Sequence, residues 1–330
     1  MSALAPLLEA FFTERLIGQR QVSQHTVAAY RDAFCLLLRF AQHRIGRAPH
    51  QLQLDDLDAN LIGAFLNHLE AERGVTVRTR NARLTAIRSL FHFSSYRHPE
   101  HAALIQRVLA IPAKRTDRAI VTYLNDEEME ALLAAPDRST RLGRRDQTLL
   151  MLAVETGLRV SELTGLTCAS VELGTGAHVR CHGKGRKERI TPLRRETRKM
   201  LRAWLDERNG APGDPMFPGP TGGRLSRDAI RRLVERHVVM AATVCPSLAA
   251  KDISPHVLRH SCAMNLLRNG VDTATIALWL GHEDVRTTYG VYLHADLSLK
   301  EKALARTAPP KTRPGRFRPS DALLAFLEGL

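Results

Sequence analysis

The chain has 330 residues, of which 44% are hydrophobic, and its Lys and Arg residues exceed Asp and Glu by 48 − 34 = 14. This composition excludes a disordered tail, and the length favours two domains, each with its own hydrophobic core. The excess of positive charge favours a nucleic acid as the partner. A protein that is basic without binding nucleic acid is the alternative.

Membrane and disulfide-rich classes do not fit the sequence. No apolar run approaches the roughly 18–20 residues that span a bilayer, and no signal peptide opens the chain. The cysteines are scattered and form no C-x-x-C pair, which argues against a disulfide framework or a zinc knuckle: Cys35, Cys168, Cys181, Cys245 and Cys262. We therefore expect a soluble, cytoplasmic, nucleoid-associated protein with no membrane partner.

Residues 1–111 form a predicted helical domain that binds DNA. Apolar residues recur at helical spacing in SQHTVAAYRDAFCLLLRFAQ, LDANLIGAFLNHLEAE and VTVRTRNARLTAIRSLFHFSSY. In the third stretch the apolar stripe consists of Leu84, Ile87, Leu90 and Phe91. The arginines of that stretch are interpreted as phosphate contacts, with a solvated helix face as the alternative: Arg78, Arg80, Arg83 and Arg88.

A linker is predicted over 112–122, because IPAKRTDRAIVTYL contains a proline, mixed charge and no helical period. A second domain follows over 123–305. Its first helix lies in NDEEMEALLAA, where Asn125 can act as the cap and Glu128 occupies the capping-box position. The stretch QTLLMLAVETGLRVSELTGL predicts a buried helix, a glycine turn and a second helix.

The pattern changes from helix to strand in VELGTGAHVRCHGKGRKERITPL. Short alternating runs broken by glycine predict a β-hairpin with a basic turn, and helices return after residue 193. Residues 306–330 are predicted to be a Pro/Arg-rich connector and an amphipathic helix. The expected fold class is therefore mainly α with a small β-sheet (α+β).

Four polar stretches stand out in the second domain: TGLRVSEL, HGKGRKER, SPHVLRHS and LGHEDVRTTYGVYLH. Each has an ordinary explanation. Arg159 and Glu162 could form a surface ion pair, and His256 and Arg259 could share one face of a helix that begins at Pro255. Together, however, two arginines, a lysine and two histidines are the groups needed to hold and protonate a phosphodiester, and tyrosines follow.

In order and spacing these stretches resemble the motifs of the tyrosine site-specific recombinases, also called the phage-integrase family, and among them the Xer-like and mobile-element enzymes. The resemblance covers roughly residues 5–300 and implies a SAM-like core-binding domain before a catalytic domain of the tyrosine recombinase fold. It implies that the catalytic residues include Arg159, Lys184, His256, Arg259 and His282, with Glu162 in support. Lys187 is the less favoured alternative to Lys184, and Arg186 and Lys187 are assigned to DNA binding.

The nucleophile needs a choice between two tyrosines. The usual Xer-like spacing from the LGH histidine ends at Val291, so Tyr289 lies two residues early and Tyr292 one residue late. Only Tyr292 is followed by the small or apolar residue and histidine that are typical of the family, in YLHADL. We therefore predict Tyr292 as the nucleophile, with a one-residue insertion accommodated at Gly290.

The implied chemistry is transesterification through a 3′-phosphotyrosyl intermediate, which stores the phosphodiester bond energy without ATP. Arg159 and Arg259 would clamp the non-bridging oxygens, and Lys184 would protonate the leaving 5′-oxygen. His256 would accept the phenol proton and His282 would bind the phosphate. No metal or cofactor is expected, since the sequence has no paired carboxylates or His/Cys cluster near these motifs.

The expected function is site-specific recombination for integration or excision of a mobile element or for dimer resolution. The expected partners are double-stranded DNA with inverted-repeat sites and further copies of the chain in a tetramer, alone or with a sister recombinase. The apolar helix in RPSDALLAFLEGL is expected to dock on a neighbouring subunit, or otherwise on its own domain. A type IB-like topoisomerase, a non-catalytic DNA-binding regulator and a metal-dependent nuclease are the alternatives.

Overall fold

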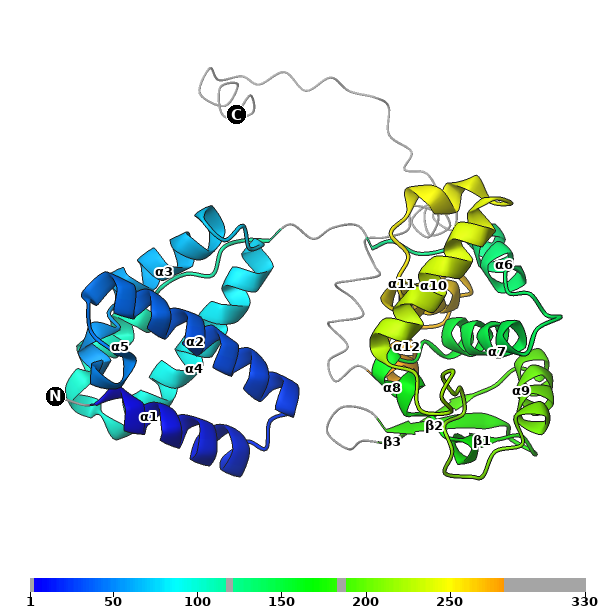
Figure 1. Cartoon of the computed structure of the whole chain (residues 1–330), viewed down its shortest axis with the longest axis horizontal. Helices are drawn as coiled ribbons and strands as arrows, with labels where there is room; N and C mark the ends of the chain where they lie inside the picture. Colours follow the sequence, from blue (N-terminus) through cyan, green and yellow to red (C-terminus); the bar gives the residue numbers. More distant parts are fainter. Residues whose placement is uncertain (1–2, 117–120, 183–187, 282–330) are drawn as a thin grey trace, which may run out of the picture. The chain divides into compact units, whose positions relative to one another are not determined.

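The computed structural model describes residues 3–116, 121–182 and 188–281, which belong to two compact units, Met1–Arg118 and Ala119–Leu330 (Figure 1). In the described part of the N-terminal unit, all regular elements are helices. They are α1 (Leu4–Ala10), the π-helix η1 (Phe11–Gln19), α2 (Gln24–Ile45), the 3₁₀ turns η2 (Pro49–Gln51) and η3 (Leu54–Asp56), α3 (Ala59–Ala71), α4 (Val77–Arg97), η4 (Pro99–His101) and α5 (Ala102–Leu109).

Polar caps fix where the three long helices of this unit begin. The Ser23 side chain accepts a hydrogen bond from the Thr26 N–H (3.2 Å), and Asp58 accepts one from the Leu61 N–H (2.7 Å). Thr76 caps α4 in the same way. Each cap satisfies an N–H that the helix itself cannot, at a typical gain of about 1 kcal/mol.

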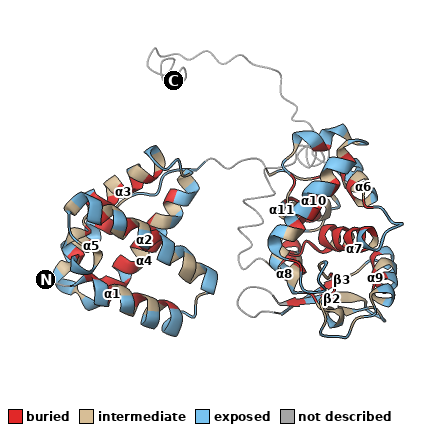
Figure 2. Ribbon diagram, viewed as in Figure 1, coloured by how far each residue is buried: buried red, intermediate tan, exposed pale blue. Residues whose placement is uncertain are grey.

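The core of the N-terminal unit is aromatic and aliphatic, and the predicted stripe of α4 faces it. Leu84, Ile87, Leu90 and Phe91 are all buried, as the red inner face of α4 in Figure 2 illustrates. This burial confirms the helical period predicted for the stretch.

The described part of the second unit combines helices with a small sheet. The helices are α6 (Asp126–Ala134), α7 (Arg141–Thr156), α8 (Val160–Gly165), α9 (Arg195–Arg208), α10 (Arg227–Ala242), α11 (Pro255–Arg268) and α12 (Thr273–Leu280), with 3₁₀ turns η5 (Cys168–Ser170) and η7 (Pro246–Ala250). The strands β1 (Val171–Glu172), β2 (His178–His182) and β3 (Glu188–Pro192) form an antiparallel sheet in the order β1-β2-β3. The predicted α+β class is confirmed. The strands β2 and β3 pair as the predicted hairpin requires, and its basic turn lies outside the described residues.

The helix α7 forms the centre of the second unit. Most of its residues are buried, and Figure 2 shows it almost wholly red. It packs against α9 and α11. Because α11 carries two of the predicted catalytic residues, the central helix also forms the support of the candidate site.

The predicted capping box of α6 is present. The Asn125 side chain accepts from the Glu128 N–H and the Glu128 carboxylate accepts from the Asn125 N–H, both at 2.8 Å. Lys251 Nζ also donates to Glu128 (2.6 Å) and to the Tyr123 carbonyl (2.9 Å). These bonds fasten the first residues of the second unit to the segment that leads into α11. In the described ranges, no helix is both long and apolar enough to cross a membrane.

Candidate active site

The turn between α7 and α8 brings the first predicted motif to the end of α12. Gly157 ends α7 with a left-handed φ of +61°, and a Cβ at this position would lie 2.6 Å from Leu280 Cδ2. Only glycine combines this backbone conformation with so close an approach. The TGLR segment therefore turns directly beneath the last residues of α12.

Arg159 and Glu162 form a largely enclosed pair instead of a surface ion pair. The Glu162 carboxylate accepts hydrogen bonds from the Arg159 backbone N–H (2.7 Å) and from Arg159 Nη1 (3.0 Å). The Glu162 side chain is 3% exposed, whereas that of Arg159 is 35% exposed. Arg159 Nη2 also donates to the carbonyl of Gly281 (2.8 Å). Glu162 therefore orients an arginine that still reaches solvent.

Arg259 approaches the same place from α11. Its Nη1 donates to the Gly157 carbonyl (2.6 Å) and its Nη2 to the Leu280 carbonyl (2.7 Å). The residue is only 3% exposed, so its guanidinium is held within the unit and not in solvent. His256 lies one turn earlier on α11, exposed, with its ring centroid 4.4 Å from that of His260 in an edge-to-face arrangement.

A third arginine, which the sequence motifs did not single out, completes the cluster. Arg189, on β3, donates from Nη2 to Glu162 (2.7 Å) and from Nη1 to the Trp279 carbonyl (2.6 Å). Three successive carbonyls at the end of α12 thus each accept from a different arginine. The only sequence signal for Arg189 was its position inside the quoted stretch HGKGRKER.

Carboxylate and carbonyl acceptors both orient the arginines of this cluster. Arg159 and Arg189 share the carboxylate of Glu162. Arg159, Arg189 and Arg259 also donate to main-chain carbonyls. A carbonyl orients a guanidinium without cancelling its charge, which is a property that suits a phosphodiester site.

Comparison with known proteins identifies the family. Residues 122–298 match the phage integrase family, and residues 10–98 match the N-terminal SAM-like domain of phage integrases. The chain belongs to the phage integrase family. It is a tyrosine recombinase, an enzyme of site-specific recombination that cleaves and rejoins DNA strands.

Relatives match along nearly the whole recombinase. The protein y4rC of Sinorhizobium fredii, named as a candidate integrase/recombinase, is 52% identical over 329 residues, covering 100% of this chain and 99% of that one. The tyrosine recombinase XerC of Pelobacter propionicus is 33% identical over 318 residues, covering 94% and 98%.

Solved structures share the fold. The XerH site-specific recombinase bound to palindromic difH substrate superposes with a TM-score of 0.69 at 24% identity, over 87% of this chain and 81% of that one. The Tn1549 transposon integrase in complex with circular intermediate DNA gives a TM-score of 0.68 at 16% identity, over 93% and 100%. These similarities confirm the predicted recombinase fold.

Some predicted site residues of the recombinase lie outside the described residues. They are Lys184, Arg186 and Lys187 between β2 and β3, and His282, Tyr289 and Tyr292 after α12, and the C-terminal segment 306–330 lies there too. The described part brings together Arg159, Glu162 and Arg259, and places His256 on the helix of Arg259.

The four arginines predicted to bind DNA differ in their surroundings. Arg78 is exposed. Arg80 is 5% exposed and donates to Asn81 (3.0 Å) and to the Pro112 carbonyl (3.2 Å), while Arg88 donates to the Ile111 carbonyl. Arg83 is half-buried, and its Nη1 has no hydrogen-bond partner among the described residues. Arg80 and Arg88 thus both bond within the unit, whereas Arg78 is exposed.

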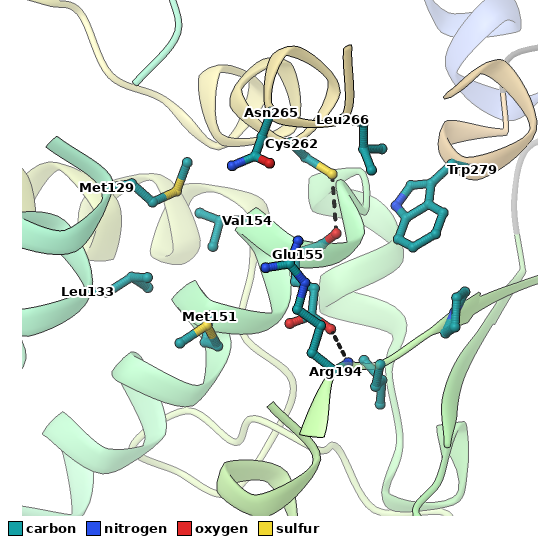
Figure 3. A pocket seen from close by; sticks show the side chains of 12 residues that line it. Met129, Leu133, Met151, Val154, Glu155, Arg194, Cys262, Asn265, Leu266 and Trp279 are labelled. Carbon is teal, nitrogen blue, oxygen red and sulfur yellow. Dashed lines mark hydrogen bonds between the residues drawn. The ribbon is translucent and has the colours of Figure 1, made fainter. Parts of the chain in front are cut away.

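An apolar pocket of about 390 Å³ is lined by residues of α6, α7 and α11 and by Trp279 of α12 (Figure 3). Met129, Met151 and Leu266 contribute to its wall, and the Trp279 ring borders it. The Cys262 thiol donates to the Glu155 carbonyl (3.2 Å), and burial raises its pKa to about 12. That thiol is therefore protonated and unreactive near neutral pH, and the pocket contains neither Arg159 nor Arg259.

Proposed function

We propose that the recombinase cleaves one DNA strand with Tyr292 and holds the 3′ end as a phosphotyrosyl ester. The observation that supports this most directly is that Arg159 and Arg259 donate to the adjacent carbonyls of Gly281 and Leu280. The family's phosphate-binding arginines therefore share one site, at the helix end from which the chain continues to His282 and Tyr292.

The proposed reaction needs no cofactor, because the bond that forms at phosphorus replaces the bond that breaks. The Tyr292 oxygen bonds to phosphorus as the bond to the 5′-oxygen breaks, with His256 accepting the phenol proton and Lys184 supplying a proton to the leaving oxygen. Arg159 and Arg259 stabilise the charge that develops on the non-bridging oxygens, and His282 donates a further hydrogen bond. Attack by the 5′-hydroxyl of another strand reverses these steps and rejoins the DNA.

The test uses a nicked half-site substrate that traps covalent protein. Tyr292→Phe should bind this DNA with the parent's affinity and form no adduct, because the attacking oxygen is missing. Tyr289→Phe is the matched control and should form adduct. Adduct from Tyr292→Phe but not from Tyr289→Phe would refute the assignment. A parent protein that binds DNA without forming adduct would favour the non-catalytic regulator.

We further propose that the recombinase acts in the cytoplasm, on the nucleoid, at double-stranded sites with inverted repeats. It assembles there as a tetramer, alone or with a sister recombinase, in integration or excision of a mobile element or in dimer resolution. The DNA-bound XerH and Tn1549 structures support DNA as the partner.

We also propose that the C-terminal segment docks in trans on a neighbouring subunit. Deleting residues 319–330 should therefore spare half-site binding and weaken cooperative assembly. Unchanged assembly would contradict this role.

For DNA binding we propose Arg78, Arg83 and Arg88 in the N-terminal unit, with Arg80 after release of its present contacts, and Arg186 and Lys187 in the hairpin. A protein that neutralises phosphates loses affinity with salt, with a log–log slope of roughly −0.9 per phosphate contacted. Arg83→Ala should make this slope shallower by about one contact. A slope identical to that of the parent would remove Arg83 from the interface.

A further inference from the structure

We propose that Arg189 is a positioning residue of the recombination reaction. It touches neither DNA nor the nucleophile in this assignment, but it holds both Arg159, through Glu162, and the turn at the end of α12. The inference rests on the proposed function and extends it to a residue outside the catalytic set that the family resemblance supplied.

The first link runs through Glu162. One of its oxygens, Oε2, accepts from two donors, the Arg159 backbone N–H and Arg189 Nη2, both at 2.7 Å. The other, Oε1, accepts from Arg159 Nη1 at 3.0 Å. In a buried carboxylate, the loss of one donor leaves an oxygen under-bonded and favours rotation of the group. Since Arg159 is aimed by this carboxylate, removing Arg189 would let Arg159 move.

The second link runs to the end of α12. Arg189 Nη1 donates to the Trp279 carbonyl at 2.6 Å. A Cβ added at Gly281 would lie 3.2 Å from Arg189 Cδ and 3.4 Å from Nη1, so the Arg189 side chain packs directly beneath the Gly281 turn. Gly281 itself adopts a φ of +65° and precedes His282 in the chain. We infer that Arg189 fixes the position of the Gly281 backbone, from which the chain continues to His282.

The geometry favours arginine over lysine at this position. The two Nη atoms donate to acceptors on different elements, α8 and α12, and a planar guanidinium holds both directions at once. The side chain is 10% exposed, and its Nε has no hydrogen-bond partner among the described residues. Burying a cation with an unpaired donor is costly, and a buried ion pair is often no more stable than an apolar replacement. Stability alone thus gives a weak reason for this arrangement, whereas orientation of Arg159 gives a strong one.

The hairpin offers a competing route of action. Arg189 pairs with Cys181 across the sheet, and β2 and β3 flank the segment that contains Lys184. A substitution at Arg189 could therefore act through the lysine that protonates the leaving group. Arg189 also contacts the Cys181 side chain on β2. Its two donated hydrogen bonds run to Glu162 and to the Trp279 carbonyl, so we assign its effect to Arg159, and the experiments below separate the two routes.

The first experiment measures single-turnover cleavage and DNA affinity for three variants of the full chain. Arg189→Met should slow cleavage at saturating DNA by about 100-fold, since small displacements of a catalytic group have effects of that order. Its DNA affinity should stay that of the parent. Arg189→Lys should recover part of the rate. Arg180→Met is the matched control, because Arg180 lies on the adjacent strand in an exposed pair with Glu188 (3.2 Å), and it should cleave normally.

Two further measurements separate the routes. In a double-mutant cycle, Glu162→Gln combined with Arg189→Met should lose little more rate than the worse single variant, because both act on Arg159. A substrate whose leaving 5′-oxygen is replaced by sulfur needs no proton donor, and it should not rescue Arg189→Met. Rescue by sulfur would overturn the assignment in favour of the lysine, and additive losses would overturn the link through Glu162.

Parental cleavage by Arg189→Met, or equal losses of affinity and rate, would also overturn the proposal. If circular dichroism shows that Arg189→Met is unfolded, Arg189→Lys carries the test, and a parental rate for it would be the overturning result. A parent that forms no adduct would refute the proposed function instead, so the two failures are distinguishable.

Discussion

Two clusters in the second unit each gather arginine side chains around one carboxylate, and we assign them different roles. One surrounds Asp146 on α7, and the other surrounds Glu162 on α8 and includes the carbonyls at the end of α12. Both place guanidinium groups around a single buried carboxylate. They differ in the share of the arginine donors that the carboxylate accepts.

Around Asp146 most of the described donors meet the carboxylate, although Arg145 Nη1 also donates to the Pro218 carbonyl (2.6 Å). Arg145 donates from Nε (2.9 Å) and Nη2 (2.7 Å), Arg236 from Nη2 (2.8 Å), and the His237 Nε2 atom lies 2.9 Å away. Burial alone would raise the pKa of Asp146, but the hydrogen bonds from His237 and Arg145 outweigh it and lower that pKa. The acceptor sites of the carboxylate are filled, so the cluster locks α7 to α10.

Around Glu162 most of the described side-chain hydrogen bonds of the arginines go to main-chain carbonyls. Arg259 has two such bonds, while Arg159 keeps the more exposed position. Carbonyl acceptors fix direction and leave the charge in place. From this comparison we infer that an arginine bonded mainly to carbonyls is a better candidate phosphate ligand than one bonded mainly to a carboxylate.

The largest expected effect is on the site cluster. Arg259→Ala, and separately Arg159→Ala, should reduce the cleavage rate by about 10²–10³, the usual cost of removing one donor to a developing charge. DNA affinity should fall far less. Adduct formation on a nicked substrate and a gel-shift titration measure the two quantities. An equal loss in both would make these arginines ordinary backbone anchors and would break the contrast between the clusters.

At Asp146 we expect a smaller effect, on the free energy of unfolding instead of the cleavage rate. Asp146→Asn leaves Arg145 and His237 without their anionic partner and should lower the free energy of unfolding by about 3 kcal/mol, the range for breaking a buried ion pair. Cleavage per folded molecule should not change. Denaturant unfolding, together with the adduct assay, checks both. A catalytic defect at full stability would mean that this cluster belongs to the site.

The smallest effect is a pH dependence of stability. The folded pKa of Asp146 is lowered from its ordinary value of 3.8, so its contribution is complete above that value and is lost as pH falls from there through the folded pKa. The stability gap between the parent and Asp146→Asn should therefore be constant near neutrality and narrow on acidification below about pH 4. Urea unfolding at several pH values measures it, and a gap that widens in acid would reverse the sign argued here.

Local sequence determined much of the fold and part of the site. The caps at Ser23 and Asn125 and the stripe of α4 follow from hydrogen bonding and periodicity over a few residues, so they were predictable. The glycine-broken alternation likewise gave the hairpin. Arg159 is the N-cap of α8 and Glu162 lies three residues later in its first turn, so their pairing too is local.

Only the tertiary structure decided which acceptors each arginine meets. Arg80 and Arg83 sit in one stretch with similar chemistry, yet Arg80 is enclosed by contacts that include the carbonyl of Pro112, 32 residues away. Arg189 and Arg259 come to α12 from 90 and 21 residues away. Helical period and motif spacing carry no information on such long-range acceptors, because these are set by how the elements pack. The end of α12 became a three-arginine site only when α8, α11 and β3 met there.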